Sequence, residues 1–202
     1  MFVQVIQGRT GKPEEVHAAM ERWTKELAPG AAGWLGSTGG VTGDGRLIAL
    51  ARFESADAAR RNSERPEQDR WWRETAALLD GDAGFADSED VMLDLVGDPD
   101  KAGFVQVMRG RGTDPQRAQE LMRLDSDKWA AFRPEILGTV AVGHPDGGYT
   151  VALYFTSEAE AREGERKEPP PELAANMEEM NKLMTGEPEF FDLKQPWLYA
   201  PR

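Results

Sequence analysis

Apolar residues recur with two different periods along the first hundred positions. Residues 2–8 are apolar with almost no alternation, which is typical of a strand covered on both faces. From residue 13 to 27 apolar side chains return every three or four positions, which predicts an amphipathic helix. Residues 34–41 and 46–53 flank a Thr-Gly-Asp-Gly turn and predict a β-hairpin.

Two more helices and a last strand are expected after this hairpin. Ser55 stands where a helix N-cap belongs, so a short helix follows it. Pro66 opens another helix, which runs to about Leu79 and is stopped by Gly81. A last strand is expected near Val91–Leu95. The order is β-α-β-β-α-β with the second helix broken in two, which is the ferredoxin-like arrangement of α+β folds.

The same pattern returns after residue 101. Residues 104–111 repeat six of the eight amino acids of residues 2–9, and the shift of 102 holds to about residue 65 before it becomes 105. The counterpart of the last strand falls near Trp197–Tyr199. We therefore predict two ferredoxin-like repeats, residues 1–101 and 102–202, and a period of this length lets each repeat bury its own core.

The composition narrows the range of functions. A net charge of −12, scattered over the chain, disfavours nucleic acid and anionic membranes as partners. The absence of cysteine excludes disulfides and thiolate nucleophiles, and neither histidine has a second ligand at metal spacing, so no metal and no cofactor are expected. No secretion signal or membrane-spanning stretch is found, and a cytoplasmic location is expected.

Each repeat resembles the dimeric α/β-barrel superfamily, in particular its antibiotic-biosynthesis-monooxygenase-like members. The resemblance rests on the opening strand, the Gly8-Arg9 step, the central hairpin and the Trp71-Trp72 pair. Because the pattern occurs in each repeat, the resemblance covers nearly the whole chain. It implies that the repeats pair their antiparallel sheets into one intramolecular dimeric α/β barrel, as a monomer or a further homodimer. It also implies substrate pockets between each sheet and its helices. The axial histidine of the haem-degrading branch has no match here.

Side chains that persist or differ between the repeats are candidate contacts to a small apolar or aromatic molecule. The amides retained in both opening strands are either structural bridges or pocket contacts. The tryptophans that the second repeat lacks are either core packing or the wall of a cavity for flat ligands. The candidate ligand contacts are Gln4, Trp34, Trp71, Trp72, Gln106 and Asn176.

Two residues of the second repeat are candidate catalytic groups. Asp125 replaces Trp23 on an otherwise apolar helix face, where a carboxylate either gains a raised pKa and acts as a base or rotates into water. Tyr154 replaces Arg52, and its phenol can donate a hydrogen bond to a carbonyl oxygen.

Three functions follow from these candidates. The first is a cofactor-independent monooxygenase acting on an aromatic or polycyclic metabolite, which the resemblance and the tryptophans suggest. The second is a non-catalytic ligand-binding or stress-response module of the same fold, because few polar groups converge in either repeat. The third is an isomerase or lyase that uses Asp125 as a buried base.

Overall fold

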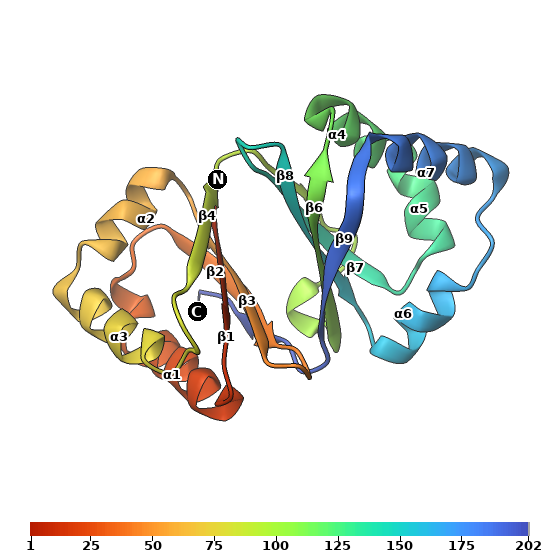
Figure 1. The fold of residues 1–202 in the computed structure, drawn as a ribbon. Helices are drawn as coiled ribbons and strands as arrows, with labels where there is room; N and C mark the ends of the chain where they lie inside the picture. Colours follow the sequence, from red (N-terminus) through yellow and green to blue (C-terminus); the bar gives the residue numbers. More distant parts are fainter. Residues whose placement is uncertain (202) are drawn as a thin grey trace. The chain divides into compact units, whose positions relative to one another are not determined.

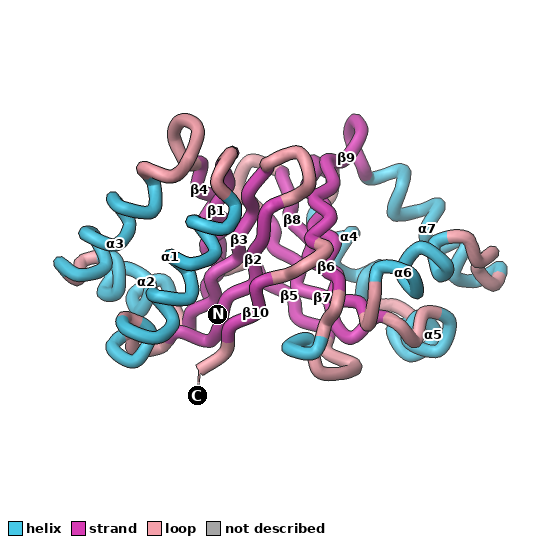
Figure 2. The backbone as a smooth tube through the Cα atoms, turned by 90° about the horizontal axis from the view of Figure 1, so that it is seen from below, coloured by secondary structure: helices cyan, strands magenta, loops and turns pink. Residues whose placement is uncertain are grey.

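The chain forms two compact α+β units in a computed structural model that describes residues 1–201. Unit 1 comprises Met1–Val91 and Gln195–Arg202, and unit 2 comprises Met92–Lys194. Each unit is a five-stranded antiparallel sheet whose helices lie on one face (Figure 1), and Figure 2 shows the same layering from below. The prediction of an α+β fold built from two ferredoxin-like repeats is confirmed.

Unit 1 has the strand order β10-β2-β3-β1-β4. Its elements are β1 (Phe2–Arg9), α1 (Pro13–Glu26), a 3-10 turn (Ala28–Gly30), β2 (Trp34–Val41), β3 (Arg46–Phe53), α2 (Ala56–Ser63), α3 (Pro66–Ala76), β4 (Gly84–Ser88) and β10 (Trp197–Tyr199). The predicted helices and hairpin are all present. Val3 and Val5 are fully buried, as expected for an opening strand without alternation.

Unit 2 has the strand order β5-β7-β8-β6-β9. Its elements are β5 (Val91–Asp94), a 3-10 turn (Pro99–Lys101), β6 (Phe104–Gly112), α4 (Pro115–Arg123), α5 (Ser126–Phe132), β7 (Ile136–Gly143), β8 (Gly148–Phe155), α6 (Glu158–Glu165), α7 (Pro171–Leu183) and β9 (Met184–Leu193). The duplication therefore extends to the order of the strands within each sheet.

Local sequence signals explain several element boundaries. Ser55 caps α2 by accepting a hydrogen bond from the Ala58 backbone N–H, and Ser157 caps α6 in the same way. Gly45 closes the β2–β3 hairpin at a φ of +82°, a conformation that costs glycine little and other residues more. The turn formers and caps read from the sequence therefore act where they were expected.

The last strands differ from the prediction. The fourth place in the first repeat's sheet is taken by β4, in which Ala86 lies opposite Val5 of β1. The expected strand near Val91–Leu95 becomes β5, which pairs with β7 of unit 2, while β10 pairs with β2 of unit 1. The repeats thus exchange their last strands. The sequence does not predict a strand over residues 84–88 because glycine, alanine and aspartate have low strand propensity.

The closure of the two sheets into one barrel, which the superfamily resemblance implies, stays a prediction.

None of the helices in the described residues has the length and apolar character that crossing a membrane requires.

Candidate functional site

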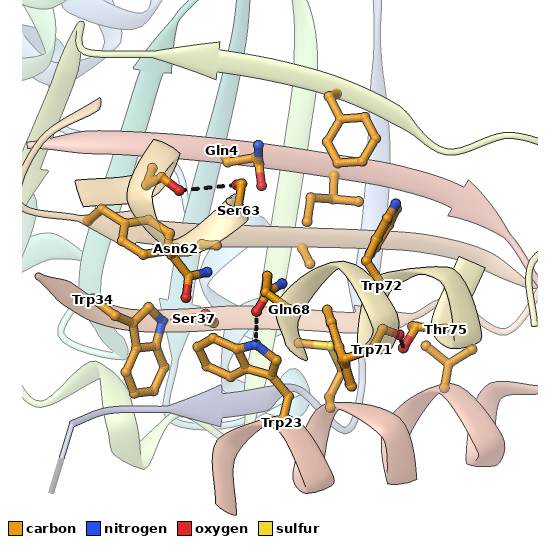
Figure 3. A pocket seen from close by; sticks show the side chains of 18 of the residues that line it. Gln4, Trp23, Trp34, Ser37, Asn62, Ser63, Gln68, Trp71, Trp72 and Thr75 are labelled. Atoms are coloured by element: carbon orange, nitrogen blue, oxygen red, sulfur yellow. Dashed lines mark hydrogen bonds between the residues drawn. The ribbon is translucent and has the colours of Figure 1, made fainter. Parts of the chain in front are cut away.

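Unit 1 contains a cavity of about 230 Å³ between its sheet and helices α1, α2 and α3 (Figure 3). Ala49 and Ala51 face this space from the centre of β3, between the larger Leu47 and Phe53 on the same face. Two short side chains in the middle of a strand leave room that the helices above do not fill. The cavity therefore exists because β3 carries alanine where a core strand usually carries larger residues.

Four tryptophans form an aromatic wall around the cavity. Trp23 meets Trp34 edge-on, with ring centroids 5.1 Å apart, and lies 6.2 Å from Trp71. Trp72 continues the series with its ring centroid 6.1 Å from that of Trp71, and it meets the Phe85 ring edge-on with centroids 5.3 Å apart. Such edge-to-face and tilted contacts are the geometries that aromatic rings prefer. The result is a broad apolar surface suited to a flat ring system.

Hydrogen bonds hold three of these rings in place. The indole N–H of Trp71 donates to the backbone oxygen of Ala19 at 2.9 Å, and that of Trp34 donates to the Ser37 hydroxyl at 3.0 Å. The indole N–H of Trp23 donates to Oε1 of Gln68 at 2.6 Å. Because the polar atom of each ring is satisfied, the apolar faces are left to line the cavity.

Polar side chains gather at one end of the cavity, where Figure 3 shows Gln4, Asn62, Ser63 and Gln68 together. Arg65 donates to Oδ1 of Asn62 at 2.9 Å, just as the Trp23 indole donates to Gln68. Guanidinium and indole groups can only donate, so the oxygen of each amide must face them. The NH₂ groups of Asn62 and Gln68 are consequently the ends left for a ligand, and this end of the cavity offers hydrogen-bond donors.

The cavity has little ionisable character. Asp69 is the one ionisable side chain among its described lining residues, and this exposed carboxylate is paired with Arg73. The described residues contain no cluster of three or more histidine, cysteine, aspartate or glutamate side chains that could hold a metal ion. The arrangement can bind and orient a flat molecule, and it can stabilise negative charge on an oxygen through neutral amide donors.

The exchanged strand β10 completes the cavity. Trp197 is 8% exposed, lines the cavity, and stacks on the His17 ring of α1 with centroids 4.8 Å apart and planes 1° from parallel. Its position opposite Gly39 of β2 comes from the β10–β2 pairing. The candidate site of the first repeat therefore includes a side chain from the end of the second.

Tyr199 follows Trp197 on the same face of β10, and its buried hydroxyl has no hydrogen-bond partner among the described residues. Burial, with a smaller effect of Glu21, raises the pKa of Tyr199 to about 12. The folded protein keeps this proton to higher pH than the unfolded chain does. The free energy of unfolding should therefore fall as pH rises from about 10 to about 12.

The variant Tyr199→Phe is expected to lose this part of the alkaline decline, and to melt at an equal or higher temperature at pH 7, because a buried unpaired hydroxyl is removed. Thermal melts of both proteins between pH 8 and 12 measure the difference. Identical pH profiles for the two proteins would contradict the assignment.

The structure brings four of the predicted ligand contacts together: Gln4, Trp34, Trp71 and Trp72 all line the cavity. Gln106 and Asn176 belong to unit 2 and are engaged there. The Gln106 amide donates to Oδ1 of Asp192 at 2.9 Å, and the buried Asn176 amide donates to the Leu121 backbone oxygen at 3.2 Å. These two amides do not line the unit 1 cavity.

The predicted catalytic residues also lie in unit 2. The helix that should have carried Asp125 is divided: α4 ends at Arg123, and Asp125 takes a left-handed conformation at a φ of +59° before α5 begins. Its carboxylate lies 2.8 Å from the Lys128 ammonium. Tyr154 is buried in β8, with 2% of its surface exposed. Neither residue lines the unit 1 cavity.

Sequence reasoning missed Asn62, Gln68 and Trp197 as parts of the site. A signal existed for Asn62, because it follows Ala58 and Ala59 by four and three positions and so shares the buried face of α2. Trp197 could not have been assigned to the first repeat, because its placement follows from the exchange of β10.

Comparison with known proteins identifies the fold. No family model matches the sequence, and no curated protein sequence is matched. Two solved structures named "putative monooxygenase" share the fold. The one from Lactobacillus acidophilus NCFM has a TM-score of 0.72 and 10% sequence identity, over 98% of both chains. The one from Fusobacterium nucleatum has a TM-score of 0.74 and 10% identity, over 98% of this chain and 94% of that one. The chain therefore has the same fold as these two structures.

The crystal structure of an anthrone oxidase-like protein is also similar, at TM-score 0.67 and 14% identity, over 100% of this chain and 91% of that one. The shared fold therefore extends over both repeats. Identities this low carry the fold alone, and the activity has to be argued from the site.

Proposed function

We propose that the unit 1 cavity binds a flat aromatic molecule of two or three fused rings, and that the protein is a cofactor-independent monooxygenase acting on it. The observation that carries this proposal is the combination of a tryptophan wall with amide donors at one end of the same cavity. Aromatic walls favour flat rings, and a few placed polar groups orient them.

The size of the cavity is consistent with such a ligand. An enclosed apolar cavity of about 150 Å³ accepts benzene. The 230 Å³ of the unit 1 cavity therefore suits a larger, fused ring system. Its lining includes exposed residues such as Ser63 and Phe85, so one edge of a ligand can reach solvent.

The proposed reaction uses the substrate itself as the reductant. With anthrone, the CH₂ carbon loses two hydrogens and gains one oxygen atom from dioxygen, while the second oxygen atom leaves as water with those two hydrogens. The substrate first loses a proton at the rim, where Asp69 and solvent are the available acceptors. Amide donors of Asn62 and Gln68 would then stabilise the oxyanion, as preorganised donors do in other enzymes. The names of the structures that share the fold support this reaction class.

Oxygen uptake tests the activity. Protein added to anthrone, 1,8-dihydroxyanthrone or 1-naphthol, each of which gains one oxygen atom on forming its quinone, should raise both dioxygen consumption and quinone absorbance above the buffer rate. Asn62→Leu should slow that reaction, because the variant removes a donor from the polar end and puts an apolar side chain of similar size in its place. Rates equal to buffer for all three compounds would overturn the monooxygenase proposal.

A second candidate, binding without chemistry, is favoured by one observation. Among the described residues that line the cavity, Asp69 is the one ionisable side chain, and it is exposed. The described lining therefore contains no buried group that could serve as a base. Saturable quenching of tryptophan fluorescence by 2-naphthol, together with buffer-level oxygen uptake for every oxidisable compound, would favour this module. The isomerase or lyase hypothesis is not proposed, because Asp125 lies outside this cavity and pairs with Lys128.

The exchanged strand offers a prediction about ligand affinity. Trp197→Ala is expected to raise the Kd for 2-naphthol at least tenfold, because it removes one aromatic wall and opens the cavity beside β10. A tenfold change corresponds to about 1.4 kcal/mol. Quenching of the remaining tryptophans measures the Kd. The control is Trp129→Ala, which removes the tryptophan that does not line the cavity and should leave the Kd unchanged. Equal effects of the two variants would contradict this role of Trp197.

A further inference from the structure

The two units place side chains of different size at equivalent sites of their central strands. In β3, Ala51 lies opposite Gln4, and in β8 the equivalent Leu153 lies opposite Gln106. One pair further along, Ala49 lies opposite Ile6 where Val151 lies opposite Met108. The strand registers are identical, so these differences are substitutions at the same place in the same fold. Together they add five carbon atoms to the region of unit 2 that corresponds to the cavity floor.

The larger side chains of unit 2 are packed together. Val151 forms a buried cluster with Met92 and Ala141, and partly buried apolar residues, Leu153 among them, pack against it. Leu153 also packs against the neighbouring cluster that contains Phe104 and Phe155. Residues equivalent to those that line the unit 1 cavity thus contact one another, and close packing leaves little room for a ligand.

The polar groups at the equivalent end of unit 2 are engaged as well. The Gln106 amide donates to Asp192, whose other oxygen pairs with Arg162. Leu173, which is 1% exposed, stands where unit 1 has Gln68. Of the polar side chains that line the unit 1 cavity, Gln4 therefore has a counterpart, Gln106, that is bonded within unit 2, and Gln68 has an apolar counterpart, Leu173.

We propose that the chain binds one ligand, in unit 1, and that Ala49 and Ala51 are the residues that keep this site open. Val151 and Leu153 fill the equivalent site of unit 2, which serves as a closed structural copy. This inference rests on the proposed function as far as a flat aromatic ligand is concerned, and it does not require that the ligand be oxidised.

Reciprocal exchange of these residues tests the proposal, with 2-naphthol as the probe and isothermal titration as the measurement of stoichiometry. The full-length wild-type chain should bind one equivalent. The variant Ala49→Val/Ala51→Leu should raise the Kd tenfold or more without lowering the melting temperature, because the added carbons enter empty space. The variant Val151→Ala/Leu153→Ala should bind two equivalents. If it fails to fold by circular dichroism, Leu153→Ala alone replaces it.

The outcomes separate this inference from the proposed function. Two equivalents bound by the wild type would overturn the inference and leave the proposed function intact. One equivalent bound both by the wild type and by the folded Val151→Ala/Leu153→Ala variant would also overturn it. If the wild type binds none, the proposed function fails. In that case, binding of one equivalent of 2-naphthol by the Val151→Ala/Leu153→Ala variant would still support the proposal that Val151 and Leu153 fill the unit 2 site. Binding of none by this variant would overturn that part as well.

Discussion

Replacing Trp71 by alanine is expected to lower the free energy of unfolding by about 3–5 kcal/mol, the usual cost of removing a large buried aromatic side chain. Trp71 is 7% exposed and contacts both Trp23 and Trp72. The alanine variant enlarges an existing cavity and leaves the Ala19 backbone oxygen without its indole donor. Urea denaturation followed by far-UV circular dichroism measures the change without depending on tryptophan fluorescence.

Two companion variants identify the source of the Trp71 effect. Trp71→Phe keeps most of the apolar surface and loses the hydrogen bond to Ala19, so it should cost distinctly less than the alanine variant. Trp129→Ala removes a partly buried ring outside the cavity and should also cost less. If Trp71→Ala cost no more than Trp129→Ala, the aromatic wall would not be part of the unit 1 core.

The second large effect is expected in unit 2. Glu135→Gln should lower the free energy of unfolding by about 3–5 kcal/mol, because breaking a buried ion pair leaves the other charge uncompensated. The side chains of Glu135 and Arg133 are 6% and 14% exposed. Arg133 also donates to the Ala161 backbone oxygen at 3.3 Å and lies 6.0 Å from the centre of the Phe155 ring. The guanidinium therefore cannot move into water without losing these contacts.

Glu64→Gln is the matched control for Glu135→Gln, because it breaks the exposed pair between Glu64 and Arg60 on α2. It should leave the denaturation midpoint unchanged, since exposed pairs contribute little. A double change to Arg133→Met and Glu135→Leu should recover much of the loss, as replacing both partners by apolar residues often does. Equal midpoints for Glu135→Gln and Glu64→Gln would show that the unit 2 pair is hydrated.

This ion pair also explains a second difference between the repeats. Gly164 leaves the space that the Glu135 carboxylate occupies, and a Cβ at that position would collide with it. In unit 1 the equivalents are Asn62 in place of Gly164 and Gly33 in place of Glu135. Both positions therefore differ between the repeats. As a result Asn62 occupies this place in unit 1 and presents its amide to the cavity, while unit 2 holds a buried ion pair there.

Fold prediction succeeded where the information is local. The helix over residues 13–27, the hairpin turn at 42–45 and the cap at Ser55 each depend on spacing or backbone preferences within a few residues. Internal repetition then doubled the evidence for each element. The sequence did not predict β4, because glycine, alanine and aspartate are uncommon in strands. This strand is stabilised by its pairing with β1, which lies far away in the sequence.

The predicted site residues stay predictions as to function, but the structure shows where each of them lies. The contrast between the repeats singled out Trp34, Trp71 and Trp72, and all three line the cavity. The same contrast singled out Asp125, but Asp125 begins a separate helix beside Lys128. An apolar stripe predicts which face of a helix is buried, but it does not predict where that helix is interrupted.

The sequence by itself determined the α+β class, the duplication and most secondary-structure elements, because these follow from hydrophobic period, turn chemistry and self-similarity. Only the tertiary structure decided that β10 pairs with β2, that Trp197 therefore lines the unit 1 cavity, and that Ala49 and Ala51 leave that cavity open. Strand partners and empty space arise from contacts between residues far apart in the chain. Alternation of polar and apolar residues along one strand does not specify which strand will lie beside it.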